Sequence, residues 1–237
     1  MSEAQALWNQ LAAAANLPLS DSQQQQLSRY LDLLEQANQR MNLTRITDRA
    51  AAEIQHIGDS LTLLPHLPTN ASNIADVGSG GGVPGLPLAI ARPDCRITLI
   101  ESTKKKANFL SETAAQLNLT NVTVVPDRAE DVGQSPLRET FDIAIARAVA
   151  ELVWLAEWCL PLVKTGGAML AMKGARATAE LPAATRAAKL LGAAEPTVHP
   201  VSLPGADHHV IIEMRKQRPT DRRYPRPPTL AKAKPLA

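Results

Sequence analysis

A glycine-rich segment, residues 76–85, restricts the possible folds of this chain more than any other stretch of the sequence. It follows the apolar run 73–77, which predicts a buried strand, and it precedes residues 86–92, whose composition predicts a helix. Glycine lets the backbone turn sharply and leaves no Cβ between the backbone and a ligand. A strand, a glycine-rich turn and a helix in this order predict a cradle for a nucleotide cofactor. A turn without a ligand is the alternative, and the density of glycines argues against it.

Two cofactor classes compete for this turn. Residues 80–85 fit the spacing of the dinucleotide fingerprint, which is weak evidence by itself. The spacing Asp-x-Gly-x-Gly-x-Gly over residues 76–82 resembles the pattern of S-adenosylmethionine-dependent methyltransferases more closely. Counted from Gly78, which follows the strand directly, the dinucleotide pattern fails because Val83 replaces its third glycine. Asp76 also suits a cationic cofactor better than a pyrophosphate. We therefore predict S-adenosylmethionine as the cofactor.

Strands and helices alternate from residue 73 onward, which predicts a parallel sheet with right-handed crossovers. The predicted strands after the first are 96–100, 122–125, 141–146 and 168–172, and the predicted helices between them are 104–118, 151–163 and 178–191. Two further strands, 197–203 and 209–214, flank Pro204-Gly-Ala-Asp207 and predict a hairpin. The predicted fold class is α/β: a class I S-adenosylmethionine-dependent methyltransferase sheet, Rossmann-like, with a terminal antiparallel hairpin and an N-terminal helical cap.

The chain divides by composition into an N-terminal helical cap (1–70), a methyltransferase core (71–215) and a basic, proline-rich tail (216–237). In the cap, Ser20 and Gln23 predict a capping box that starts a helix ending near Asn42, and a second helical segment stops before Pro65. We expect the tail to pack poorly and to contact RNA phosphates, with a solubilising end as the alternative. Its removal is then expected to weaken RNA binding and leave cofactor binding intact.

Composition excludes several other classes. The formal net charge of the 237 residues is +2, so charge alone does not indicate a nucleic-acid binder. Cys95 and Cys159 form no disulfide framework and show no metal-ligand spacing, so we interpret both as core thiols in a reducing compartment. Neither a signal peptide nor a membrane-spanning segment is evident. We predict a cytoplasmic protein, a monomer, with no metal.

Charged residues at the ends of the later strands are candidates for the cofactor and the substrate. Glu101 ends the second strand, where a carboxylate accepts hydrogen bonds from ribose hydroxyls, or is simply solvated. Ala129 and Glu130 follow the third strand and face the adenine edge in this interpretation. Arg147 ends the fourth strand and is a candidate for the methionine carboxylate, an RNA phosphate or Glu130, with a structural ion pair as the alternative. Lys173 ends the fifth and is a candidate for phosphate.

The fourth strand restricts the chemistry. Enzymes that methylate exocyclic amines usually place an Asn/Asp-Pro-Pro-aromatic segment there, and this chain has Ile-Ala-Ile-Ala-Arg over residues 143–147. Carbon-5 methylation requires a cysteine nucleophile, and neither cysteine is placed for it. An acceptor with its own lone pair remains, such as ring nitrogen 7 of guanine. Catalysis then comes from positioning and electrostatics, without a general base.

Short motifs are spread in order over nearly the whole chain. They include Asn42-Leu-Thr44, His56-Ile-Gly-Asp59-Ser60, Val83-Pro-Gly-Leu-Pro, Leu99-Ile-Glu101-Ser102, Arg128-Ala-Glu130, Ala146-Arg147-Ala148, Lys173-Gly174 and Arg223-Tyr-Pro-Arg226. On these residues the chain resembles the bacterial 16S ribosomal RNA guanine-7-methyltransferase family, also known as glucose-inhibited division protein B. The resemblance implies a guanine in the 530 loop of 16S rRNA, in the small ribosomal subunit, as the substrate.

The motifs and the resemblance together define the predicted site. No residue is assigned to acid–base or covalent catalysis, and the positioning candidates are Arg147, Lys173 and His56. The predicted cofactor contacts are Asp76, Gly78, Gly80, Val83, Glu101, Ala129, Glu130 and Arg147. The predicted RNA contacts are Arg128, Lys173, Arg223 and Arg226.

Departures from the family and two rival functions accompany this prediction. Asp207-His208-His209 stands where the family commonly has Glu-Arg-His, so one permanent cation is lost. His56, with Asp59 and Ser60 beside it, is either a core histidine or a residue on the substrate side. The first rival is a small-molecule methyltransferase with the cap as a lid. The second is a non-catalytic RNA-binding module with a vestigial cofactor pocket.

Overall fold

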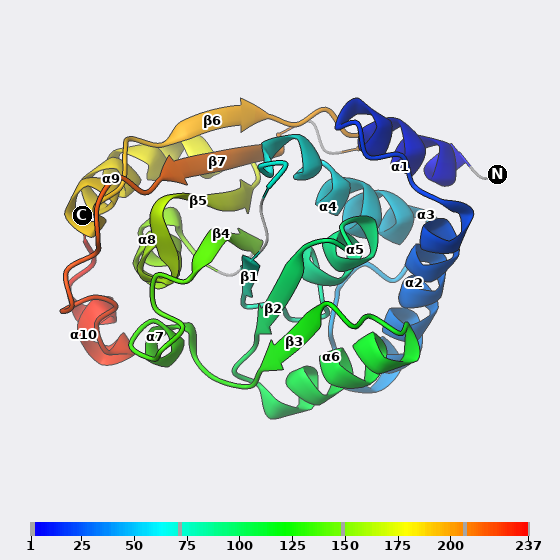
Figure 1. Cartoon of the computed structure of the whole chain (residues 1–237), viewed down its shortest axis with the longest axis horizontal. Coiled ribbons are helices and arrows are strands. Elements are labelled where there is room, and N and C mark those ends of the chain that lie inside the picture. The colour runs from blue at the N-terminus through cyan, green and yellow to red at the C-terminus, as the bar shows by residue number, and fades with distance from the viewer. Residues whose placement is uncertain (1–2, 71–72, 148–149, 206–207, 237) are drawn as a thin grey trace.

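The computed structural model describes residues 3–70, 73–147, 150–205 and 208–236. In these ranges, 7 strands form one sheet in the order β3-β2-β1-β4-β5-β7-β6 (Figure 1). The strands are β1 (Asn73–Val77), β2 (Arg96–Ile100), β3 (Val122–Val125), β4 (Phe141–Arg147), β5 (Val163–Lys173), β6 (Thr197–Pro200) and β7 (Val210–Arg215). Strands β1 to β5 are parallel, and β7 is antiparallel to both β5 and β6. The predicted α/β sheet with a terminal antiparallel hairpin is confirmed.

The helices lie between these strands and before the first of them. They are α1 (Glu3–Ala14), α2 (Asp21–Met41), α3 (Arg49–Ala52), α4 (Asp59–Leu61), α5 (Gly85–Ala91), α6 (Lys104–Gln116), α7 (Ala129–Val132), α8 (Leu152–Cys159), α9 (Ala177–Leu191) and α10 (Pro228–Ala233). A π-helical turn, Glu53–Gly58, joins α3 to α4. In the predicted hairpin turn, Ala206 and Asp207 lie outside the described residues.

Both faces of the sheet are buried, as is usual when helices cover a parallel sheet on two sides. On one face, Ile74 and Ile145 belong to a core that includes residues of α1, α2, α5 and α6. On the other face, Ala75 and Ala144 belong to a core with α8 and α9. Successive residues of one strand thus point to opposite layers. The carboxyl ends of β1 to β4 remain between the two layers, and the site lies there.

The cap is anchored to the glycine-rich turn. The predicted capping box is present: Ser20 Oγ accepts from the Gln23 backbone N–H at 3.3 Å, and Gln23 Oε1 accepts from the Ser20 N–H at 2.9 Å. Helix α2 ends at Asn42, which has the left-handed conformation (φ 50°). Within this helix the buried Tyr30 donates its hydroxyl to the Gly81 carbonyl at 2.9 Å. Helix α2 therefore fixes the turn that follows β1.

The second cap segment differs in detail from the prediction. Its α-helical part ends at Leu61, and Pro65 lies within a 3-10 turn, Leu64–His66. Trp8 and Leu61 are fully buried in the same core as Ile74 of β1. The predicted boundary at residue 70 therefore does not separate two hydrophobic cores. In Figure 1 the cap helices lie to the right of the sheet, with α1 level with β6 and β7 and α2 next to α6.

The prediction of a poorly packed tail is wrong. Residues 216–236, here named the C-terminal strap, run from β7 to α10, which lies close to α7 and α8 (Figure 1). Lys216 is 2% exposed, and its Nζ donates to the carbonyls of Leu160 at 2.6 Å and Val163 at 3.1 Å. Burial lowers the pKa of Lys216 to about 8. Tyr224 and Leu236 are also buried.

A second anchor of the strap is an ion pair to α8. Arg226 Nε and Nη2 donate to the two carboxylate oxygens of Glu157, both at 2.7 Å, and the side chains are 14% and 4% exposed. The composition of the tail predicted solvated lysines and arginines. Composition does not show that Lys216 and Arg226 have carbonyl and carboxylate partners in the fold, and so the prediction failed. The strap is thus part of the folded domain.

Candidate active site

The glycine-rich turn after β1 has the backbone geometry that its sequence predicts. Gly78 and Gly80 have φ values of 75° and 56°, a region that side chains rarely tolerate. A Cβ on Gly82 would lie 2.5 Å from Leu86 Cδ1. The turn therefore requires glycine at these positions, and it exposes its backbone to an adjoining cavity.

The carboxylate of Asp76 holds this turn by a hydrogen bond to its last residue, Gly85. Its Oδ2 accepts from the Gly85 N–H at 3.0 Å, and the residue is 1% exposed. Burial raises the pKa of Asp76 to about 7, and Oδ1 has no hydrogen-bond partner among the described residues. Asp76 is absent from the cavity wall described next. One oxygen of this carboxylate holds the start of α5, and a direct contact of Asp76 with the cofactor stays a prediction.

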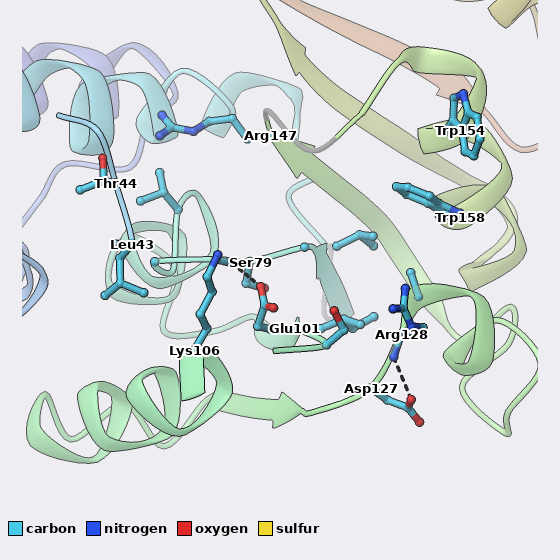
Figure 2. A pocket seen from close by; sticks show the side chains of 18 of the residues that line it. Leu43, Thr44, Ser79, Glu101, Lys106, Asp127, Arg128, Arg147, Trp154 and Trp158 are labelled. Atoms are coloured by element: carbon cyan, nitrogen blue, oxygen red, sulfur yellow. Dashed lines mark hydrogen bonds between the residues drawn. The ribbon is translucent and has the colours of Figure 1, made fainter. Parts of the chain in front are cut away.

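A cavity of about 490 Å³, here named the first cavity, opens at the carboxyl ends of β1 to β4. Figure 2 shows Lys106 and Arg128 extending toward it from two sides, with Glu101 between them. Its wall contains Leu34, Leu43, Thr44, His56, Val77, Gly78, Ser79, Gly80, Gly81, Val83, Ile100, Glu101, Ser102, Lys106, Asp127, Arg128, Ala129, Glu130, Arg147, Trp154, Trp158 and Pro228. Of the predicted cofactor contacts, all except Asp76 line this cavity.

Glu101 is the acid at the end of β2. It is 6% exposed, its Oε2 accepts from the Gly80 N–H at 3.0 Å, and its Oε1 accepts from the Thr103 N–H at 2.7 Å. Each carboxylate oxygen has two lone pairs, so each keeps one for a further donor. Glu101 is thus a fixed acceptor that faces the cavity rather than a solvated strand-end acid.

Arg147, at the end of β4, lies in a chain of polar contacts that joins the sheet to the cap. Its Nη1 donates to Asp59 Oδ2 at 2.8 Å and to the Gln55 carbonyl, and its Nη2 lies 3.1 Å from His56 Nδ1. On either side, His56 Nε2 lies 3.0 Å from Thr44 Oγ1, and Asp59 Oδ1 lies 3.2 Å from His209 Nδ1. Figure 2 shows Arg147 extending toward the cap, away from Glu101. Of the partners considered from the sequence, the structural ion pair is the one observed, and it is with Asp59.

The two histidines in this chain of polar contacts, His56 and His209, have pKa values shifted in opposite directions. Burial, with the Arg147 charge as the second cause, lowers the pKa of His56 to about 4. A neutral His56 can accept from Arg147 at Nδ1 and donate to Thr44 from Nε2. The hydrogen bond to Asp59 raises the pKa of His209, which is half-buried. A neutral His56 leaves the charge of these contacts on Arg147 and Asp59, and Asp59 favours the protonated form of His209.

The predicted RNA contacts are spread over the molecule. Arg128 lines the first cavity. Lys173 lies outside it, where its Nζ contacts Glu180 Oε2 at 2.8 Å and the Ala150 carbonyl at 2.9 Å. Arg223 is 68% exposed and pairs with Asp221 at 2.7 Å. Arg226, predicted to contact RNA, has its guanidinium occupied by Glu157 and the Lys234 carbonyl, because its main role in the fold is to fasten the strap.

The sequence patterns did not indicate several residues of the cavity wall. Trp154 and Trp158 lie at helical spacing in an apolar segment, a pattern that predicts core residues, yet both are only partly buried and face the cavity. Their ring centroids are 6.2 Å apart, with an interplanar angle of 66°. Lys106 is the third lysine of a run on α6. Pro228 comes from the strap, whose packing no local pattern predicted.

Within the described ranges, the structure shows neither a metal-binding cluster nor a membrane-spanning helix. No cluster of three or more His, Cys, Asp or Glu side chains there is arranged to hold a metal ion. None of the helices in the same ranges combines the length and apolarity that crossing a bilayer requires.

Comparisons with known proteins agree with this geometry. The family model described as GidB, rRNA small subunit methyltransferase G, matches residues 23–211. Ribosomal RNA small subunit methyltransferase G of Macrococcus caseolyticus is 41% identical over 220 residues, 92% of each chain. The protein of the same name from Chloroflexus aggregans is 43% identical over 224 residues, 94% of each chain.

Solved structures show the fold. The cofactor-bound protein Rv0187 from MTB has a TM-score of 0.60 at 19% identity and covers 80% of this chain and 91% of its own. A SAM-dependent O-methyltransferase from Thermotoga maritima has a TM-score of 0.51 at 15% identity, covering 79% of this chain and 73% of its own. The fold is that of class I S-adenosylmethionine-dependent methyltransferases, as predicted. The sequence matches also confirm the predicted resemblance: the chain belongs to the rRNA small subunit methyltransferase G family.

Proposed function

We propose that this protein methylates ring nitrogen 7 of a guanine in the 530 loop of 16S rRNA, with S-adenosylmethionine as the methyl donor. The observation that carries the proposal is the first cavity, where a glycine turn, the fixed acid Glu101 and the basic side chains of Lys106 and Arg128 line one space at the carboxyl ends of parallel strands. The relatives are named for the small-subunit rRNA on which they act. The substrate class is therefore ribosomal RNA.

The wall of the first cavity fits the proposed cofactor. The glycine turn and Ala129–Glu130 provide close backbone approach, and Glu101 offers two acceptor sites to a pair of ribose hydroxyls. Trp154 and Trp158 provide an aromatic surface for a purine. Arg147 provides guanidinium donors near a carboxylate-bearing ligand. These groups match an adenosine joined to an amino acid.

The reaction requires no proton transfer by the protein. When bound, S-adenosylmethionine supplies the methyl carbon: the guanine N7 lone pair forms the new N–C bond, the S–C bond breaks, and its electron pair stays on sulfur. Nitrogen 7 has that lone pair at neutral pH, so a general base is unnecessary. The contribution of this chain is to hold both partners in line. The carboxylates of Glu101, Asp127 and Glu130 line the cavity and stabilise a positive charge on either partner.

The direct test uses undermodified small ribosomal subunits and cofactor labelled in the methyl group. We expect label in 7-methylguanosine, and mapping should place it in the 530 loop. Label in another nucleoside would contradict the proposal. Label only in metabolite pools would favour a small-molecule methyltransferase, and binding without transfer would favour a non-catalytic RNA-binding module.

A variant tests the cofactor site separately. Glu101→Gln removes the charge that we assign to the ribose, and we expect the affinity for S-adenosylhomocysteine to fall at least ~10-fold, or about 1.4 kcal/mol. Glu112→Gln, on the exposed surface of α6, is the matched control. Calorimetry gives both affinities. Equal affinities of the two variants would contradict the assignment of Glu101 to the ribose hydroxyls.

Where the protein acts follows from its substrate. Since rRNA is modified where ribosomes are assembled, we propose that the protein acts in the cytoplasm. The monomeric state and the exposed Arg223 and Arg128 as RNA contacts remain predictions. Gel filtration with light scattering tests the first, and the salt dependence of subunit binding by the two arginine variants tests the second.

A further inference from the structure

A second cavity, of about 700 Å³, lies beside the first. Residues of the cap, Arg45 and Gln55 among them, form one side of it, and the other side is formed by residues at the ends of β4 and β5 and the start of β7. Its volume is in the range of sites that enclose small ligands. Apart from Arg147, none of the predicted cofactor contacts lines this second cavity.

Arg147 is in the wall of both cavities. Ligands in the two cavities would therefore be neighbours that share this side chain. An acceptor atom must approach the methyl carbon directly for in-line transfer, so its site has to adjoin the cofactor site. The second cavity is next to the first at Arg147, as such a site has to be.

The charges of the second cavity suit a nucleotide. Its interior cations have carboxylate partners: Arg147 contacts Asp59 at 2.8 Å, His209 contacts the same Asp59 at 3.2 Å, and Lys173 contacts Glu180 at 2.8 Å, while Glu151 in the same wall is exposed. Arg45 and Arg176 are exposed, line the same cavity, and have no carboxylate within ion-pair distance among the described residues. Two solvated arginines at the edge of an interior with paired cations fit phosphates outside and a neutral base inside.

We propose that the second cavity receives the nucleotide that carries the methyl acceptor, flipped out of its RNA, with its base inside and the flanking phosphates at Arg45 and Arg176. The proposal rests on the proposed function. Guanine N7 and O6 lie on one edge of the base. When N7 faces the first cavity, O6 therefore lies on the side formed by Arg147. Only some of the five guanidinium N–H groups of Arg147 are used by its three partners, so donors remain for O6.

Gly174 allows this cavity to be filled without disturbing the fold. It lines the second cavity, its φ lies outside the left-handed region, and a Cβ built on it has no neighbour within 4 Å. A Cβ at this position therefore meets open space, and a larger side chain is built from there. We design the series Gly174→Ala, Gly174→Leu and Gly174→Phe, with Thr178→Phe on the exposed surface of α9 as the control for an added phenyl group.

The proposal predicts a graded effect. Across the series, the rate of methylation of undermodified small subunits and the affinity for them fall with side-chain size, and Gly174→Phe loses at least ~100-fold in rate. Its affinity for S-adenosylhomocysteine, measured by calorimetry, stays within about twofold of the unmodified protein. Thr178→Phe behaves as the unmodified protein in all three measurements. Methylation by a folded Gly174→Phe at the normal rate would overturn the proposal.

A second experiment addresses the phosphates and does not depend on how Gly174→Phe folds. Filter binding gives the affinity for small subunits as a function of salt. Arg45→Ala with Arg176→Ala is expected to reduce the slope of log affinity against log salt by roughly 1.5 to 2, because two phosphate contacts are lost. The double variant Arg40→Ala with Arg186→Ala removes two exposed arginines outside both cavities and keeps the slope. Equal slopes in both double variants would overturn the proposal. If the unmodified protein did not bind S-adenosylhomocysteine at all, the proposed function would fall instead.

Discussion

Arg147 and Asp59 connect the end of β4 to the start of α4: Nη1 donates to Oδ2 at 2.8 Å, and the side chains are 17% and 4% exposed. An ion pair buried to this extent leaves an uncompensated charge when one partner is lost. Asp59→Asn keeps the size of the side chain and removes its charge. We expect the free energy of unfolding to fall by about 3 kcal/mol, as measured by urea denaturation.

The control for this variant is Asp32→Asn. Asp32 also pairs with an arginine, Arg49, but the two side chains are 51% and 34% exposed. Surface pairs contribute about 0–1 kcal/mol, so this variant should be nearly as stable as the unmodified protein. Similar losses in the two variants would mean that burial of the Arg147–Asp59 pair has no energetic consequence.

His56 predicts an acid-sensitive component of stability. Its pKa is lowered from 6.5 to about 4 by burial, so the folded protein keeps it neutral while the unfolded chain takes up a proton. The free energy of unfolding therefore falls as the pH decreases from 6.5 toward 4, by on the order of 3 kcal/mol for this group. His56→Gln should lose stability less steeply in this window. Asp76, whose pKa is raised to about 7, contributes the opposite slope in both proteins and cancels in the comparison.

The ion pair of the strap should behave as a unit. Arg226→Ala and Glu157→Gln each break a bidentate contact whose side chains are 14% and 4% exposed, and each is expected to cost about 3 kcal/mol. The double variant should cost less than the sum of the two single variants, because the second change removes the charge that the first one left unpaired. Arg223→Ala, which breaks a pair whose side chains are 68% and 45% exposed, should leave the urea midpoint unchanged. Strict additivity of Arg226 and Glu157 would contradict the contact.

Deleting residues 227–237 tests whether the strap completes the cofactor site. Pro228 lines the first cavity, so we expect the deletion to weaken binding of S-adenosylhomocysteine. Deletion from residue 215 onward removes the buried Lys216 as well and should destabilise the whole domain. Both expectations replace the one drawn from composition, in which the tail affects RNA alone. Unchanged cofactor affinity in the shorter deletion, measured by calorimetry, would restore that earlier expectation.

Tryptophan fluorescence reports on the aromatic pair. Trp154 and Trp158 are partly buried in the wall of the first cavity, whereas Trp8 is fully buried and donates to the Glu53 carbonyl at 2.9 Å. Binding of S-adenosylhomocysteine should change the emission of the unmodified protein and of Trp8→Phe by similar amounts. Trp154→Phe with Trp158→Phe should abolish the change. Trp158→Ala should also weaken binding by about 1 kcal/mol, or ~5-fold. A change that persists without the pair would place the ligand elsewhere.

The parts of the fold that the sequence predicted well are those set by local rules. Strands β2 and β3 have the predicted bounds because apolar β-branched runs end at polar turns, and the capping box of α2 depends on residues three positions apart. The glycine turn was predictable because positive φ angles leave few alternatives to glycine.

The parts that could not be predicted depend on contacts between distant residues. Arg147 and Asp59 are far apart in the sequence, and no spacing rule assigns them to each other. The strap was misjudged for the same reason, since Arg226 finds Glu157 only once α8 has packed on the sheet. Trp154 and Trp158 have core spacing on α8 and are turned to the cavity by the position of that helix.

Because one guanidinium, that of Arg147, belongs to the walls of both cavities, we expect the proposed occupants of the two cavities to affect each other's affinity. Thermodynamic reciprocity then requires that bound cofactor changes the affinity for the ribosomal particle by the same factor by which the particle changes the affinity for the cofactor. Saturating donor therefore alters the concentration of particles at which the enzyme is half occupied, and a spent donor with a neutral sulfur alters it by a different factor.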